Sequence, residues 1–111
     1  MRVALGTFDQ KKLDQIKNTL KAEFQPVRLF LFGSRANGTA SKNSDYDFVM
    51  VVTDSKKSSI DEMSRARSLI FKNHGVIADV FIYSKKEFDQ WKDEFNSIPE
   101  TALNTGKEIE L

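Results

Sequence analysis

The chain has 111 residues, 40% of them hydrophobic, which fits one compact domain over residues 1–111 with a single core. Its 17 lysine and arginine residues nearly balance 16 aspartate and glutamate residues, so no large field steers it onto nucleic acid or an anionic membrane. With no cysteine and one histidine, the chain excludes disulfides, thiolate zinc sites and imidazole-rich metal sites. Any bound metal therefore has oxygen ligands.

The N-terminal segment, MRVALGTFDQKK, has only a brief apolar patch before charged residues return. It lacks the long apolar core of a signal peptide, and no other run approaches membrane-spanning length. We therefore expect a cytoplasmic protein that does not act at a membrane.

Helix starts are predicted by capping boxes, in which Ser or Thr is followed three residues later by Glu or Gln. Four such pairs occur, at Thr7/Gln10, Ser59/Glu62, Ser84/Glu87 and Ser97/Glu100. The first helix is expected from about Phe8 to Phe24, where Gln25-Pro26 stops it, and the fourth ends near Gly106. The second closes at His74-Gly75, which makes His74 a helix-terminal residue favoured by the helix dipole rather than a catalyst.

Three aromatic residues, Phe88, Trp91 and Phe95, follow the third box at helical spacing. Aromatic residues at this spacing usually belong to a core. In a short chain with nine phenylalanines, some aromatic side chains could instead serve a partner.

Three apolar runs have strand character: Val27 to Phe32, Phe48 to Val52, and Val76 to Tyr83. Because Phe48 to Val52 is continuously apolar rather than alternating, that strand is expected to be covered on both faces. The elements follow the order helix, strand, strand, helix, strand, helix, helix, and a last strand in Lys107 to Leu111 is left open. This order predicts an α+β, two-layer fold in which helices pack against a small mixed β-sheet.

Two aspartates, Asp45 and Asp47, stand at the start of the second strand and project from the same face because side chains alternate. Like charges roughly 4 Å apart repel by about 4 kcal/mol at an effective dielectric constant near 20. That cost requires a cation, a shared proton or full hydration. Asp79 interrupts the third strand, and if the two strands are neighbours it can join the pair as an oxygen ligand for Mg²⁺.

Gly33-Ser34 ends the first strand and suits phosphate binding. Glycine allows close backbone approach, and Ser34 offers a hydroxyl and nearby N–H groups at the start of a short helix or turn. Magnesium often completes its shell with substrate phosphates, so this turn and the carboxylates indicate a nucleotide site. Arg35 and Lys42 are nearby cations that either contact the triphosphate or are solvated.

The combination of these motifs resembles the DNA polymerase β superfamily of nucleotidyltransferases, and in particular its minimal nucleotidyltransferase branch. Gly33-Ser34, ten further residues, Asp45-Tyr46-Asp47 before an apolar strand, and the later Asp79 carry the resemblance, which covers roughly residues 27–83. It implies the polymerase β-like fold, two Mg²⁺ ions held by the three aspartates, and a triphosphate bound at the Gly-Ser turn. In the family, the third aspartate ligates the metal that activates the attacking hydroxyl.

The resemblance further implies transfer of a nucleoside monophosphate, most plausibly AMP from ATP, to an acceptor. Larger relatives carry a C-terminal helical domain that holds the acceptor, and this chain is expected to lack it. A second polypeptide would then take that place, and in this branch it is often a helical HEPN-domain protein, a toxin that the nucleotidyltransferase adenylylates as its antitoxin. Homo-oligomeric and hetero-oligomeric assembly are both left open.

The competing interpretation is a non-catalytic module that binds a nucleotide, or neutralises its partner by contact alone. A third interpretation, an enzyme that extends nucleic acid, is disfavoured by the balanced charge.

Overall fold

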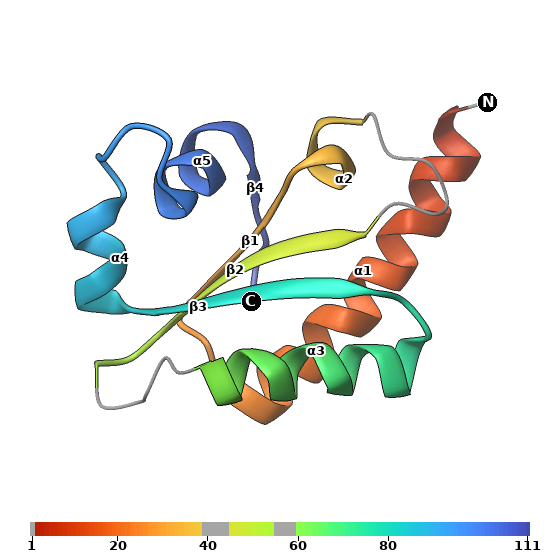
Figure 1. The fold of residues 1–111 in the computed structure, drawn as a ribbon. Coiled ribbons are helices and arrows are strands. Elements are labelled where there is room, and N and C mark those ends of the chain that lie inside the picture. Colours follow the sequence, from red (N-terminus) through yellow and green to blue (C-terminus); the bar gives the residue numbers. More distant parts are fainter. Residues whose placement is uncertain (1, 39–44, 55–59) are drawn as a thin grey trace.

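The computed structural model describes residues 2–38, 45–54 and 60–111, and of residues 2–9 and 37 only the backbone. Its elements follow the predicted order, with one short helix added after the first strand (Figure 1). They are α1 (Arg2–Phe24), β1 (Arg28–Phe32), α2 (Ser34–Asn37), β2 (Tyr46–Val52), α3 (Ile60–His74), β3 (Ala78–Ser84), α4 (Lys85–Trp91), α5 (Ile98–Thr105) and β4 (Lys107–Glu108). The predicted α+β fold with a mixed sheet is confirmed.

The four strands form one sheet in the order β3-β2-β1-β4. β1 pairs antiparallel with both β2 and β4, whereas β2 and β3 are parallel. Parallel neighbours need a crossover connection, and α3 supplies it. The last strand, which the sequence left open, forms over Lys107–Glu108 beside Phe30 and Leu31.

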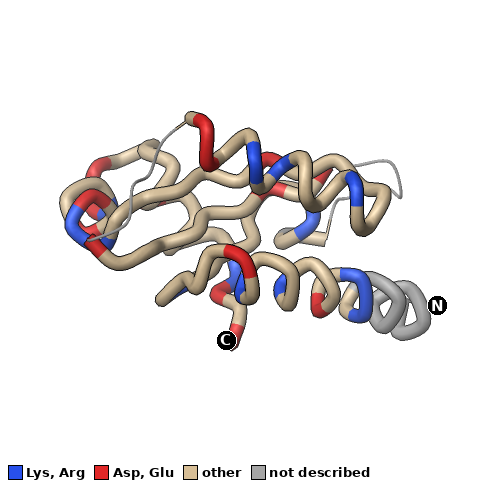
Figure 2. Tube along the Cα trace, turned by 90° about the horizontal axis from the view of Figure 1, so that it is seen from below, with Lys and Arg blue, Asp and Glu red and all other residues tan. Residues whose placement is uncertain are grey.

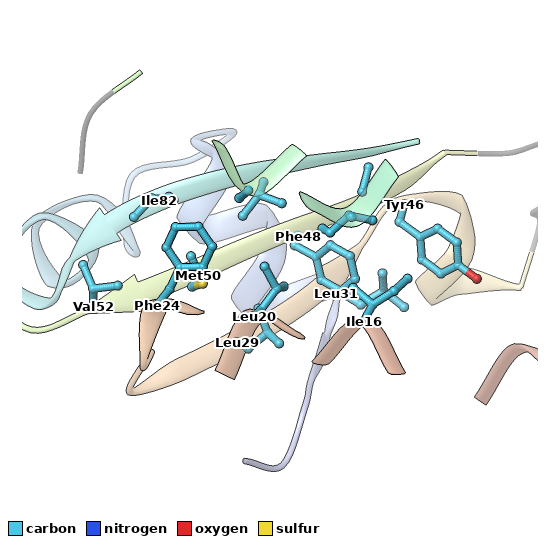
Figure 3. Close-up of a cluster of buried hydrophobic side chains, with 14 of the residues drawn as sticks. Ile16, Leu20, Phe24, Leu29, Leu31, Tyr46, Phe48, Met50, Val52 and Ile82 are labelled. Atoms are coloured by element: carbon cyan, nitrogen blue, oxygen red, sulfur yellow. The ribbon is translucent and has the colours of Figure 1, made fainter. Parts of the chain in front are cut away.

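One face of the sheet carries the larger core, beneath α1 and α3 (Figure 3). The buried residues of this core are Ile16, Leu20, Phe24, Leu29, Leu31, Ala36, Tyr46, Phe48, Met50, Val52, Ala66, Ile70, Ala78, Val80 and Ile82. The opposite face carries a smaller core beneath α4 and α5, formed by Phe30, Val49, Val51, Phe88 and Ala102. Because both faces of β2 are covered along Phe48–Val52, the two-sided burial predicted from its continuous apolar run is confirmed.

Two of the predicted N-terminal caps form at α4 and α5. The Ser84 hydroxyl accepts a hydrogen bond from the Glu87 N–H at 3.1 Å, and the Glu87 carboxylate accepts one from the Ser84 N–H at 2.8 Å. The Ser97 hydroxyl accepts from the Glu100 N–H at 3.2 Å. Ser59, the predicted cap of α3, lies outside the described residues.

The predicted start of α1 is wrong, because the helix begins at Arg2 and Thr7 lies inside it. The segment before Thr7 contains good helix formers, and the one glycine among them costs only about 1 kcal/mol relative to alanine. A capping box is therefore a local signal that a favourable upstream sequence overrides. None of the helices in the described part of the chain is both long and apolar enough to cross a membrane.

The aromatic residues after Ser84 do not all enter the core, as their spacing predicted. Phe88 is buried and stacks on Phe30 with ring centroids 5.4 Å apart, but Trp91 is 45% exposed and Phe95 is 84% exposed. The helix ends at Trp91, whose carbonyl accepts hydrogen bonds from the Glu94 N–H and the Ser97 hydroxyl. Because the chain turns there, the helical spacing no longer determines where Phe95 points.

His74 does end α3, where Gly75 adopts a left-handed conformation with φ 69° and its N–H bonds the Phe71 carbonyl. The surroundings of its ring nevertheless disfavour the charged form, against the effect of the helix dipole. Partial burial, and then the charge of Lys12, lower the pKa of the imidazole. Lys12 itself donates to the His74 carbonyl at 3.2 Å, so lysine and not histidine supplies the positive charge at this helix end.

Candidate active site

Two of the three predicted carboxylates come from neighbouring strands at the same level of the sheet. Asp47 is the second residue of β2, Asp79 is the second residue of β3, and the two are register partners in the parallel ladder. Register partners on adjacent strands project from the same face, with the strands about 4.8 Å apart. Asp45 lies directly before β2, two residues from Asp47, and is exposed.

These aspartates lie on the sheet face that α4 and α5 cover, but at its other end. Along β2, Asp47 is followed on the same face by Val49 and Val51, which lie in the smaller core. In Figure 1, the starts of β2 and β3 and the end of β1 lie together near α2, away from α4. The same face is thus apolar at one end and acidic at the other.

Gly33 brings the end of β1 against Asp47. It adopts φ 78° and ψ −157°, and a Cβ atom built on it would lie only 2.7 Å from Asp47 Oδ2. Only glycine fits here, because any side chain would displace the carboxylate and would also be strained at this positive φ. Ser34 follows as the first residue of α2, so the turn proposed for phosphate lies beside a carboxylate proposed for metal.

The electrostatics of Asp47 reflect this crowding. Partial burial, followed by repulsion from Asp79 and then from Asp45, raises the pKa of its carboxyl. Asp79 and Asp45 therefore both act on Asp47, and ionisation of Asp47 is less favourable than that of an isolated carboxyl group.

Asp79 has a positive neighbour that the sequence analysis did not identify. The Arg67 guanidinium of α3 lies 3.4 Å from Asp79 Oδ1. Arg67 and Asp79 are 12 residues apart on different elements, and no motif spacing in the sequence joins them. Only the α3–β3 crossover brings them together.

The donor set fits a hard divalent cation, because carboxylate oxygens are the ligands that Mg²⁺ prefers. Gly33 leaves room for Asp47 Oδ2, where a Cβ atom would intrude. Among residues 10–36, 38, 45–54 and 60–111, however, no three acidic or histidine side chains are close enough to surround one ion. Asp47 and Asp79 are register partners, and the three aspartates would have to draw closer together to surround one ion.

Of the two cations predicted to bind phosphate, Arg35 and Lys42, the structure describes Arg35. The Arg35 guanidinium lies 4.4 Å from the centre of the Tyr46 ring. Tyr46 belongs to the larger core and stacks on Phe48, so Arg35 is directed toward the face opposite Asp47. Lys42 lies outside the described residues.

Comparisons with known proteins agree with the fold. The profile of the family described as "Nucleotidyltransferase domain" matches residues 13–110. A crystal structure of a Sulfolobus solfataricus protein, described as a candidate nucleotidyltransferase, superposes with a TM-score of 0.52 at 24% identity, covering 75% of this chain and 73% of that one. No curated protein matches the chain significantly. Since the family profile spans most of the sequence, this chain belongs to the nucleotidyltransferase domain family.

Proposed function

We propose that this protein is a Mg²⁺-dependent nucleotidyltransferase of the EC 2.7.7 type that transfers AMP from ATP to an acceptor. The observation that carries the proposal is the register pairing of Asp47 with Asp79, with Gly33 packed against the Asp47 carboxylate. In the reaction, an acceptor hydroxyl oxygen bonds to the α-phosphorus, the bond to the β-phosphate oxygen breaks, and pyrophosphate leaves.

Each residue has a defined part in this proposal. Asp45, Asp47 and Asp79 hold two Mg²⁺ ions, which when bound lower the pKa of the attacking hydroxyl and offset the charge at phosphorus. Asp79 also accepts the proton of that hydroxyl. Gly33 and Ser34 hold the triphosphate through backbone N–H groups and the serine hydroxyl, with Lys42 as a further cation. Arg35 joins them only if it leaves the Tyr46 ring.

The acceptor is proposed to be a helical HEPN-domain protein encoded by a neighbouring gene. This chain would then be the cytoplasmic antitoxin of a toxin–antitoxin pair that adenylylates its toxin. Membership of the family supports nucleotidyl transfer, and Phe71 and Phe95, which are 60% and 84% exposed, provide apolar surface for a protein partner. Figure 2 shows basic and acidic residues interleaved along α1, and α3 carries acidic residues in its first turn and basic residues after them. This mixed charge disfavours nucleic acid as the acceptor.

The test is to incubate the purified protein with ATP labelled on the α-phosphate, Mg²⁺ and the product of the neighbouring gene. Label on that product is expected for the wild type and should be lost in Asp47→Asn and Asp79→Asn. Asp89→Asn is the matched control, since Asp89 is an exposed aspartate of α4 that pairs with Lys85 and Lys92. Unchanged labelling in soluble, folded Asp47→Asn protein would refute the proposal.

One observation favours the second candidate, a module that binds its partner or a nucleotide without turnover. The three aspartates do not close into a group that could surround one ion within the described residues. This candidate requires that neutralisation of the partner survive Asp45→Asn and Asp47→Asn together. Loss of neutralisation in that double variant, with the complex intact, would exclude it.

A further inference from the structure

The side chain of Arg67 reaches Asp79 from the opposite side of the sheet. Arg67 belongs to α3, whose residues Ala66 and Ile70 are buried in the larger core. Asp79 lies between Ala78 and Val80 on β3, and since these two residues join the larger core, Asp79 projects from the other face. β3 is an edge strand, so the Arg67 side chain must pass around its outer edge to bring the guanidinium within 3.4 Å of Asp79 Oδ1.

This placement differs from that of the neighbouring arginine of α3. Arg65 pairs with Glu62 at 3.2 Å and with Glu23 at 3.3 Å, and its guanidinium lies 4.3 Å from the Phe24 ring. Arg65 therefore joins α3 to α1 at the surface, beside Phe24 of the larger core, whereas Arg67 is directed to the acidic end of the other face. The two arginines share a helix and a charge but have different partners.

Asp79 is approached from two sides. Arg67 approaches from the outer edge of β3, whereas Asp47 lies on the inner neighbour β2. The contact between the Arg67 guanidinium and Asp79 Oδ1 is 3.4 Å long, and both side chains are well exposed, at 59% and 40%. An ion pair between side chains this exposed is weak and easily exchanged for another cation.

On the basis of the proposed function, we infer that Arg67 is a positioning residue that acts as the built-in counter-ion of Asp79. In the metal-free protein it holds the Asp79 carboxylate at the sheet edge and offsets its repulsion with Asp47. A divalent cation that binds Asp47 and Asp79 must compete with this ion pair and approach the positive charge of Arg67. Arg67 thereby lowers the affinity of the site for the cation and keeps metal binding readily reversible.

The test uses Mn²⁺ and Mg²⁺ titrations of the whole protein, followed by calorimetry and by the shift in melting temperature, so no turnover is needed. Arg67→Ala is expected to tighten cation binding about two- to fivefold, as loss of a weak surface ion pair implies. Arg67→Lys should remain near the wild type, because the proposed effect depends on the positive charge and not on the planar shape of the guanidinium. Arg65→Ala, the matched control, should leave cation affinity unchanged.

A second signature separates electrostatic competition from a purely structural role. High salt screens exposed charges, so about 0.5 M KCl should narrow the difference in cation affinity between Arg67→Ala and the wild type. Unchanged or weaker cation binding by folded Arg67→Ala would overturn the role of Arg67, while leaving the nucleotidyltransferase proposal intact. If neither protein binds a divalent cation, the proposed metal site fails, and the role of Arg67 fails with it.

Discussion

The two ends of one sheet face differ in what they contribute to the protein. At one end, Phe30, Val49 and Val51 are buried beneath α4 and α5. At the other end of the same face, Asp47 and Asp79 stand side by side, and the pKa of Asp47 is raised by burial and by its acidic neighbours. The apolar end stabilises the fold, whereas the acidic end reduces stability and concentrates the groups suited to chemistry.

The variant with the largest expected effect is Asp47→Asn, which changes the acidic end of this face. We expect nucleotidyl transfer to fall on the order of 1,000-fold, because a metal ligand is lost. The metal-free variant should nevertheless melt at a higher temperature than the wild type. The folded-state pKa of the Asp47 carboxyl is raised. The contribution of this carboxyl to the stability of the fold is therefore complete only below the unfolded-state pKa of about 3.9, and it is lost as the pH rises through the folded-state pKa.

Both halves of this expectation can be measured on one preparation. Transfer is followed with labelled ATP, and melting is followed at pH 7 with a chelator present. Mg²⁺ should stabilise the wild type but not the variant. A variant that melts lower than the wild type without metal would contradict the assignment of the acidic end as destabilising.

A second variant, Phe88→Ala, changes the apolar end of the face instead. Phe88→Ala deletes a buried ring that stacks on Phe30, and should lower the free energy of unfolding by roughly 3 kcal/mol or more. Equilibrium urea unfolding measures this loss. Activity per folded molecule is expected to remain close to that of the wild type, because Phe88 does not touch the aspartates; a selective loss of activity would show that the two ends are coupled.

Gly33→Ala tests the contact between the β1 turn and Asp47. The added Cβ would lie 2.7 Å from Asp47 Oδ2, so the carboxylate must move, and we expect at least about a tenfold loss of transfer. Gly38→Ala is the matched control, because Gly38 has a similar φ of 83° but no atom of the described residues lies within 4 Å of its added Cβ. Both variants should lose about 1 kcal/mol or more of stability from backbone strain, measured by urea unfolding. Equal activity losses would assign the effect to strain and not to Asp47.

The smallest expected effect lies away from this face, at His74. Its folded-state pKa is lowered, so the unfolded chain takes up the proton more readily. The contribution of His74 to the free energy of unfolding should be complete above the unfolded-state pKa of about 6.5. It should decrease as the pH falls below that value, by less than about 1 kcal/mol because the site is partly exposed. Urea unfolding of the wild type and of His74→Gln at pH 7.5 and 5.5 checks this, since the variant should lose less stability on acidification.

The sequence by itself determined the order of elements, the two-sided burial of β2 and the α+β fold. These features follow from local patterns: a continuous apolar run predicts a strand covered on both faces, and the Ser84/Glu87 pair predicts a helix start. It also placed Asp47 and Asp79 within strands, but their pairing depended on an assumption about which strands are neighbours.

Only the tertiary structure decided how the elements meet. It made β3 the parallel neighbour of β2, put Gly33 against Asp47, directed Arg35 to Tyr46, and brought Arg67 around the sheet edge to Asp79. It also left Phe95 exposed, where helical spacing alone predicted burial. The physical reason is that periodicity and capping act within a few residues, whereas these contacts join separate elements and depend on how the helices and strands pack.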